Sequence, residues 1–215
     1  MTDLLNLFLH LDETLGTAIA SYGNWIYGVL FLIVFCETGL IVTPFLPGDS
    51  LLFAAGAFSA TGVLNVWVIW VLLFVAAVIG DGVNYRIGRK VGARILEKGS
   101  LGGLPIKKEH IERTQQYYDK YGAKTIVIAR FLPIIRTFAP FVAGVGHMKP
   151  AVFSFYNVFG AALWVTIFVF GGYFFGNVPV IKKNFEFVII AMIIIPGLPA
   201  LIQIIREWQR SRSAK

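Results

Sequence analysis

The chain has little charge and only one cysteine. Asp, Glu, Lys and Arg make up 14% of its 215 residues, 57% are hydrophobic, and the mean hydropathy is +0.72. Soluble globular domains carry about 25% charged residues. The composition therefore excludes a soluble domain and predicts an integral membrane protein. The lone Cys36 lies in an apolar run, which excludes a disulfide framework or a cysteine-based metal site.

The sequence also lacks the short motifs of common hydrolases. It has no HExxH, no GxSxG, no cluster of Cys and His, and no evident nucleophile–base pair. We therefore predict no enzymatic activity, no cofactor and no metal ion. A basic leader region is missing as well, because acidic residues occupy the N-terminus at Asp3, Asp12 and Glu13. We expect the chain to stay whole in the membrane.

The net charge of +7 is unevenly distributed. Ten of the 19 Lys and Arg lie between Arg86 and Lys124, and four more lie between Arg206 and Lys215. Basic loops beside apolar spans stay in the cytoplasm, so both termini are predicted to be cytoplasmic. The same placement argues against nucleic acid as a partner.

The predicted fold is all-α, with four spanning helices. Residues 1–23 are predicted to form an amphipathic interfacial helix, residues 24–206 the transmembrane domain, and residues 207–215 a basic cytoplasmic tail. The predicted spans are Trp25–Val42, Val63–Tyr85, Val152–Phe175 and Phe185–Ile205. A short surface helix is predicted to begin at Pro105 and to end at Gly122.

Two further apolar segments, 43–61 and 124–147, are predicted to be re-entrant hairpins. Prolines break each of them, at Pro44 and Pro47 in the first and at Pro133 and Pro140 in the second. Their sequences FLPGDSLLFAAGAF and FLPIIRTFAPFVAGV resemble each other at an offset of about 86 residues. With the predicted topology they enter from opposite faces, which makes an inverted repeat. Such broken segments in two halves are typical of a transporter's midplane site.

Arg130 and Arg136 lie within the second broken segment. An arginine at the centre of a membrane helix costs roughly 2.5–3.5 kcal/mol on translocon scales, so it indicates function. A phosphate or another anionic headgroup is the ligand that paired guanidiniums favour. The competing interpretations are an arginine that extends to the interface or a structural ion pair.

Three acidic residues are candidates for proton coupling or gating. Glu37 and Asp49 are predicted counter-charges of the arginines, either as exchangeable proton sites or as a static ion pair. Asp81, followed by Asn84 and Arg86, is equally compatible with a role in transport and with a local salt bridge or an interface cap.

Small and aromatic residues are predicted to have packing roles. Gly56 and Gly144 are expected to permit close backbone approach. The GxxxG pairs that begin at Gly88 and Gly172 favour packing within one chain, although an oligomer remains an alternative. Trp164 is interpreted as bundle packing with no role in a site.

Four strings carry a resemblance to a known family: FCETGLIVTPFLPGDSLLFAAGAF, GDGVNYRIGR, ARFLPIIRTFAPFVAGVGHM and GYFFG. In this order and spacing the chain resembles the DedA family of bacterial inner-membrane proteins, within the wider VTT-domain superfamily. The resemblance implies two re-entrant hairpins that face each other. It also implies lipid movement across the membrane, with undecaprenyl phosphate or phosphatidylethanolamine as substrate, and a link to proton-dependent transport. The family's functional acidic residues fall on Glu37 and Asp49, and its essential arginines on Arg130 and Arg136.

The leading hypothesis is thus an inner-membrane lipid translocase, or flippase, for a phosphate-bearing lipid and coupled to protons. A passive lipid scramblase and a small-cation/proton antiporter are alternatives. A membrane lipid phosphatase is a fourth, against which the missing hydrolase motifs argue.

Overall fold

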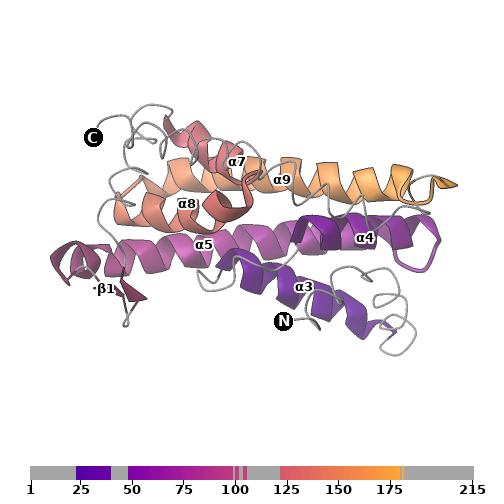
Figure 1. The fold of residues 1–215 in the computed structure, drawn as a ribbon, viewed down its shortest axis with the longest axis horizontal. Coiled ribbons are helices and arrows are strands. Elements are labelled where there is room, and N and C mark those ends of the chain that lie inside the picture. Colours follow the sequence, from indigo (N-terminus) through magenta and orange to yellow (C-terminus); the bar gives the residue numbers. More distant parts are fainter. Residues whose placement is uncertain are drawn as a thin grey trace, which may run out of the picture.

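Two long antiparallel helices form the centre of the structure. The computed structural model describes residues 23–39, 48–98, 100–101, 104–105, 122–179 and 181. Helix α5 (Val66–Lys98) and helix α9 (Pro150–Phe175) lie against each other along the long axis of the molecule (Figure 1). Among the described residues, Val66–Val91 and Pro150–Phe175 are the two stretches long and apolar enough to cross a membrane, at 26 residues each.

Shorter elements surround this pair. They are α3 (Trp25–Gly39), α4 (Gly48–Ala60), the 3₁₀ turn η1 (Gly122–Lys124), α7 (Thr125–Ala129) and α8 (Pro133–Val145). Strands β1 (Ser100–Leu101) and β2 (Leu104–Pro105) form a small antiparallel pair. Helices α4 and α8 have 13 residues each, a length of about 20 Å at 1.5 Å per residue. Neither helix alone reaches across a hydrocarbon core of about 30 Å.

The two short helices pack on different long helices. Helix α4 packs mainly on α9, and α8 packs on α5. Figure 1 shows α8 and α4 toward opposite ends of the long axis. Each short helix lies against the C-terminal half of its long helix.

Helix α4 approaches α9 through glycines on both sides. A Cβ on Gly56 would collide with the carbonyl oxygen of Val169, and a Cβ on Gly172 would collide with that of Phe53. The two backbones are therefore close enough that only glycine fits at these positions. The predicted close approach at Gly56 and the predicted intrachain use of Gly172 are both confirmed.

Helix α8 approaches α5 in the same way. A Cβ on Gly144 would collide with the carbonyl oxygen of Tyr85, and a Cβ on Gly88 would collide with that of Phe141. In both crossings the short helix carries a Phe-x-x-Gly motif. On the long helix, one residue presents its carbonyl to the glycine of the short helix, and the glycine of the long helix follows three residues later. The predictions for Gly144 and Gly88 are confirmed.

Apolar side chains fill the space between the helices and also cover much of the outside. The core gathers residues from α3, α4, α5 and α9, including Leu30, Val34, Leu52, Leu73 and Val165. Large apolar side chains such as Trp67, Val71, Phe155 and Ile167 are 48–67% exposed on α5 and α9. Exposed apolar surface on spanning-length helices fits a lipid environment.

Three sequence predictions need correction. The second span was predicted as Val63–Tyr85, but the stretch of α5 apolar enough to span is Val66–Val91 and the helix itself continues to Lys98; just past Tyr85, Gly88 still packs on α8. Pro105 was predicted to begin a helix, but it lies in β2, paired with Ser100. Pro140 was predicted to break its segment, but α8 runs through it. A proline removes only one helical hydrogen bond, and the contacts with α5 hold the helix on both sides of it.

Other predictions fall outside the described residues. These are the N-terminal amphipathic helix, Pro44 and Pro47, the interior of the surface helix, the fourth span and the basic tail.

Candidate functional site

Five charged side chains are buried near the middle of the bundle. Their exposed fractions are 0–9%, and they come from four different elements and one interhelical turn: Glu37, Asp49, Asp81, Arg130 and Arg136. Glu37 is near the end of α3, Asp49 is in the first turn of α4, and Asp81 is in the middle of α5. The structure thus brings together all five charged residues singled out in the sequence.

The break between α7 and α8 presents the two arginines. Arg130 follows the last residue of α7, and Leu132 is extended, with φ −113° and ψ 106°. A residue before proline is biased toward this extended conformation, and Pro133 then occupies the first turn of α8, where its missing N–H is not needed. Arg136 lies in the first turn of α8.

Arg136 binds two carboxylates at once. Its Nη1 donates to Asp49 Oδ1 at 2.7 Å, and its Nη2 donates to Glu37 Oε1. Glu37 Oε1 also accepts a hydrogen bond from the backbone N–H of Gly48 at 3.2 Å, at the N-terminus of α4. Any Cβ on Gly48 would collide with the Glu37 carboxylate. The glycine therefore allows this carboxylate to reach the positive end of the α4 dipole.

Arg130 has a separate set of partners. Its Nη2 donates to Asp81 Oδ2 and, at 2.6 Å, to Asn157 Oδ1 on α9. Asn157 in turn donates from Nδ2 to the carbonyl of Val78 on α5 at 3.1 Å. Asn157 thus ties Arg130 and α5 to α9.

Trp164 contacts both clusters. Its ring centroid lies 5.5 Å from Arg136 Cζ and 5.8 Å from Arg130 Cζ, within cation–π range. Its Nε1 donates to Asp49 Oδ1 at 2.8 Å. Trp164 packs in the bundle core, as predicted, and the structure adds these contacts with charged residues, which the sequence did not predict.

Asn84 joins three elements beside the charged residues. Its Nδ2 donates to the carbonyl of Thr137 on α8 at 2.8 Å and to that of Thr38 on α3 at 3.3 Å. Asn84 is fully buried on α5, one turn after Asp81. It therefore connects the end of α3 to the start of α8.

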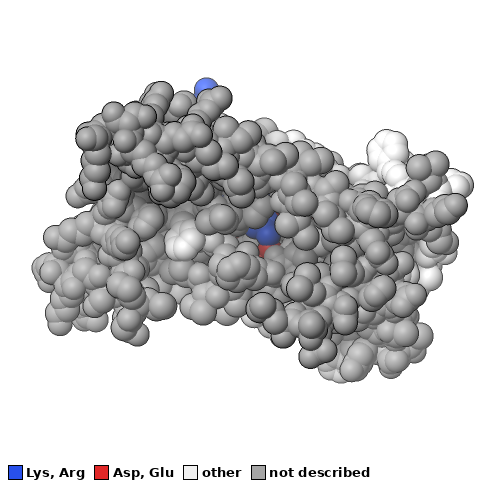
Figure 2. Space-filling view, in the orientation of Figure 1, with Lys and Arg blue, Asp and Glu red and all other residues white. Residues whose placement is uncertain are grey.

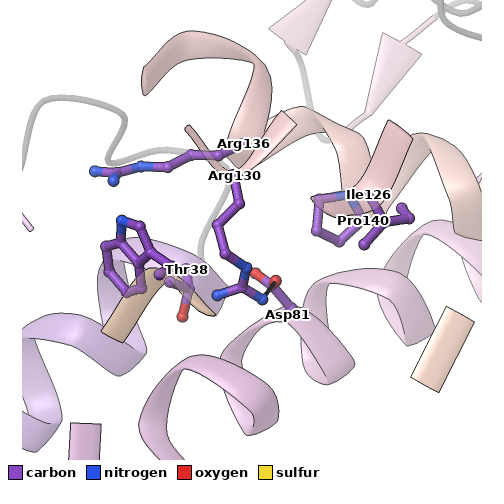
Figure 3. Close-up of a pocket in the computed structure, with 7 residues that line it drawn as sticks. Thr38, Asp81, Ile126, Arg130, Arg136 and Pro140 are labelled. Atoms are coloured by element: carbon purple, nitrogen blue, oxygen red, sulfur yellow. Dashed lines mark hydrogen bonds and ion pairs between the residues drawn. The ribbon is translucent and has the colours of Figure 1, made fainter. Parts of the chain in front are cut away.

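A small cavity lies between these groups. It is lined by Thr38, Asp81, Ile126, Arg130, Arg136, Pro140 and Trp164 and has room for about one water molecule. In Figure 3 Arg130 extends toward Asp81, whereas Arg136 extends in another direction, so the two guanidiniums do not meet. Near the middle of the face in Figure 2, a basic and an acidic side chain are visible together.

The buried polar atoms are incompletely paired. Glu37 Oε2, Arg130 Nε and Arg136 Nε are buried without a hydrogen-bond partner among the described residues. Unpaired buried donors on two arginines leave capacity for a further acceptor. No group of three or more His, Cys, Asp or Glu in the described part of the chain could hold a metal ion.

The sequence predicted the charged residues better than their neutral neighbours. Glu37 and Asp49 are counter-charges of Arg136, as predicted. Asp81 pairs with Arg130 rather than with a residue near it in sequence. The contacts that Asn157 and Trp164 make with the charged residues were missed. The available signal was an amide near the start of an apolar span and an indole in the middle of that span.

Comparison with known proteins identifies the family. The VTT domain matches residues 46–174. Protein DedA of Escherichia coli K12 is 49% identical over 99% of this chain and 97% of its own length. The chain belongs to the DedA family of VTT-domain membrane proteins.

More distant members of the family also align over most of their length. Inner membrane protein YqjA of E. coli K12 is 35% identical over 91% of this chain and 88% of its own. An uncharacterized membrane protein of Mycobacterium leprae is 37% identical over 86% and 82%. None of these three names, DedA included, states an enzymatic activity. No solved structure matches the chain.

Proposed function

We propose that this protein is a translocase that moves a phosphate-bearing lipid across the bacterial inner membrane. The observation that carries the proposal is the pair of arginines, 4% and 9% exposed, at a helix break among apolar helices. Buried guanidiniums bind phosphate through paired, charge-assisted hydrogen bonds. The substrate would be undecaprenyl phosphate or a phospholipid such as phosphatidylethanolamine, as the family resemblance implies.

The described cavity beside the arginines is too small for a headgroup. The cavity beside the arginines has room for about one water molecule, far less than a phosphate ester needs. Carboxylates occupy the guanidinium faces, Asp49 and Glu37 on Arg136 and Asp81 on Arg130. When the site opens, a headgroup would displace these carboxylates. Each arginine would then exchange a carboxylate partner for the phosphate of the lipid.

Segments 43–61 and 124–147 form, in this proposal, two re-entrant hairpins from opposite faces. Helices α4 and α8 are too short to span, and they pack on α9 and α5 through equivalent Phe-x-x-Gly contacts. Two such pairs related by inversion could rock against each other around the charged centre. That motion would open the centre to each side in turn.

Proton coupling would use the acidic residues. The three buried carboxylates exceed the two buried arginines by one negative charge among the described residues. Burial of an unbalanced charge is costly, and a carboxylate relieves the cost by binding a proton. Glu37 and Asp49 share Arg136 and are the proposed exchange sites, with Asp81 as a gate on Arg130.

The proposed location is the inner membrane with both termini in the cytoplasm. Two relatives are named inner membrane proteins, and the basic clusters favour this orientation. Membrane lipids and protons are the proposed partners.

The decisive experiment measures headgroup movement in proteoliposomes. Wild type, Arg136→Ala and Arg136→Lys would be compared with fluorescent undecaprenyl phosphate and phosphatidylethanolamine analogues, with and without a pH gradient. Lysine keeps the charge but cannot reach two acceptors as a fork, so both variants should lose transport. Full transport by Arg136→Ala would rule out the phosphate role.

The responses to the pH gradient and to the lipid substrate together distinguish the alternative functions. Lipid movement at the same rate with and without the pH gradient would indicate a passive scramblase. The excess of buried carboxylate favours a small-cation/proton antiporter as the second candidate, and it predicts cation-driven proton flux with no lipid movement.

A further inference from the structure

Trp164 is the described residue that contacts both arginines and one of their carboxylates. Its side chain is 1% exposed, although an indole on a spanning helix can equally face lipid. Trp67 on α5, by contrast, is 66% exposed. The buried position of Trp164 places a polar N–H and an electron-rich ring among charged groups.

Helix α9 is shaped to receive Arg130. Asn157, Gly160 and Trp164 follow the i, i+3, i+7 spacing of one helix face. Asn157 accepts a hydrogen bond from the guanidinium. A Cβ on Gly160 would lie 3.4 Å from Arg130 Nε, an ordinary contact distance, so this position on α9 lies directly beside the guanidinium. Trp164 adds its ring at 5.8 Å from Arg130 Cζ.

The indole also shares an acceptor with Arg136. Asp49 Oδ1 accepts from Trp164 Nε1 at 2.8 Å and from Arg136 Nη1 at 2.7 Å. If a phosphate draws Arg136 away, the indole N–H still pairs with this carboxylate. Asp49 then avoids the full cost of an unpaired buried charge.

We infer that Trp164 is a positioning residue of the proposed headgroup site. Its ring holds both guanidiniums in place, and its N–H keeps Asp49 paired while Arg136 exchanges that carboxylate for phosphate. This inference rests on the proposed function and adds to it an aromatic element on α9 that joins the two charge clusters.

Binding of a phosphate ester compared with its alcohol tests the inference. Farnesyl phosphate and farnesol would be titrated calorimetrically into purified wild type, Trp164→Phe, Trp164→Leu and, as a matched control, Trp67→Leu. Trp164→Leu should weaken phosphate binding roughly tenfold, the size of one desolvated cation–π contact. Trp164→Phe keeps a ring but removes the N–H that pairs with Asp49, so its phosphate affinity should fall between those of wild type and Trp164→Leu. Trp67→Leu and farnesol binding should be unchanged.

A residue that only packs would give another pattern. Trp164→Leu would then weaken the alcohol and the phosphate alike, or lower the melting temperature while leaving phosphate binding unchanged, and either result overturns the inference. If wild type itself binds no farnesyl phosphate, the proposed function fails and this inference fails with it.

Tryptophan fluorescence is an independent test of the inference, because it does not require the leucine variant to fold. Four of the five tryptophans would be replaced by phenylalanine, leaving Trp164 as the one emitter. Farnesyl phosphate should change the emission with the same midpoint as the calorimetric titration, and farnesol should not. Calorimetric binding with unchanged emission would overturn the role of Trp164 while leaving the phosphate site standing.

Discussion

The two buried arginines differ in the number of carboxylates that balance them. Arg136 binds Glu37 and Asp49, so that cluster carries one net negative charge. Arg130 binds Asp81 and the neutral Asn157, so its cluster is balanced. The same carboxylate-to-amide change therefore has opposite electrostatic consequences in the two clusters.

Asp81→Asn should destabilise the protein far more than Asp49→Asn. The first change leaves Arg130 buried without a carboxylate, a loss of roughly 3–5 kcal/mol for breaking a buried pair. The second brings the Arg136 cluster to neutrality. Thermal unfolding in detergent would measure both, with a drop of about 6–20 °C expected for Asp81→Asn, since a chain of this size loses about 2–4 °C per kcal/mol.

A double variant controls this comparison. Asp81→Asn combined with Arg130→Gln removes both charges and should recover part of the loss, because no unpaired ion remains. Equal losses from Asp49→Asn and Asp81→Asn would contradict the described pairing.

At the scale of helices, small residues decide where the short elements lie. The carbonyls of Val169 and Tyr85 approach Gly56 and Gly144 so closely that no Cβ fits. The position of the charged residues depends on these crossings, because Asp49 and Arg136 lie in the first turns of α4 and α8.

Gly56→Ala and Gly144→Ala should therefore each lower the melting temperature by several degrees, because overpacking costs roughly 1–3 kcal/mol. Gly28→Ala is the matched control: it lies in α3, where an added Cβ would meet no atom within 4 Å, and alanine favours a helix. Circular dichroism melts of the three variants would check this. Similar behaviour of all three would mean that the crossings tolerate side chains.

The sequence predicted some of the helix boundaries, and it predicted most of the charged residues of the site. Glu37, Asp49, Arg130 and Arg136 stand out because charge is rare in apolar segments. Trp164 and Asn157 do not stand out, since neutral residues in a span usually pack. The continuation of α5 past Tyr85 was missed for a related reason: basic residues suggested a loop, while the stabilising contact between Gly88 and α8 comes from another part of the chain.

At the scale of the whole molecule, the turns lie at two ends of the long axis. The turn after α4, which contains Thr61, lies at one end, and the turn between α8 and α9, which contains Lys149, lies at the other (Figure 1). The proposed orientation places the first turn on the periplasmic side of the inner membrane and the second in the cytoplasm.

Thr61→Cys should therefore react with a membrane-impermeant maleimide in intact cells, and Lys149→Cys should react only after permeabilisation. Both side chains are exposed. Wild type, whose one cysteine is Cys36, gives the background. The reverse labelling pattern would invert the topology without changing the fold.

The order of charges along the chain has a consequence for biogenesis. All three buried carboxylates among the described residues precede both buried arginines. Asp81 and its partner Arg130 are 49 residues apart, roughly 2–10 s of synthesis at ~5–20 residues per second. During those seconds the acidic half has no basic partner from this site, so its carboxylates must take up protons or be shielded from lipid by the insertion machinery. The first half can therefore take up its final position in the membrane only after the second half, which carries both arginines, has emerged from the ribosome.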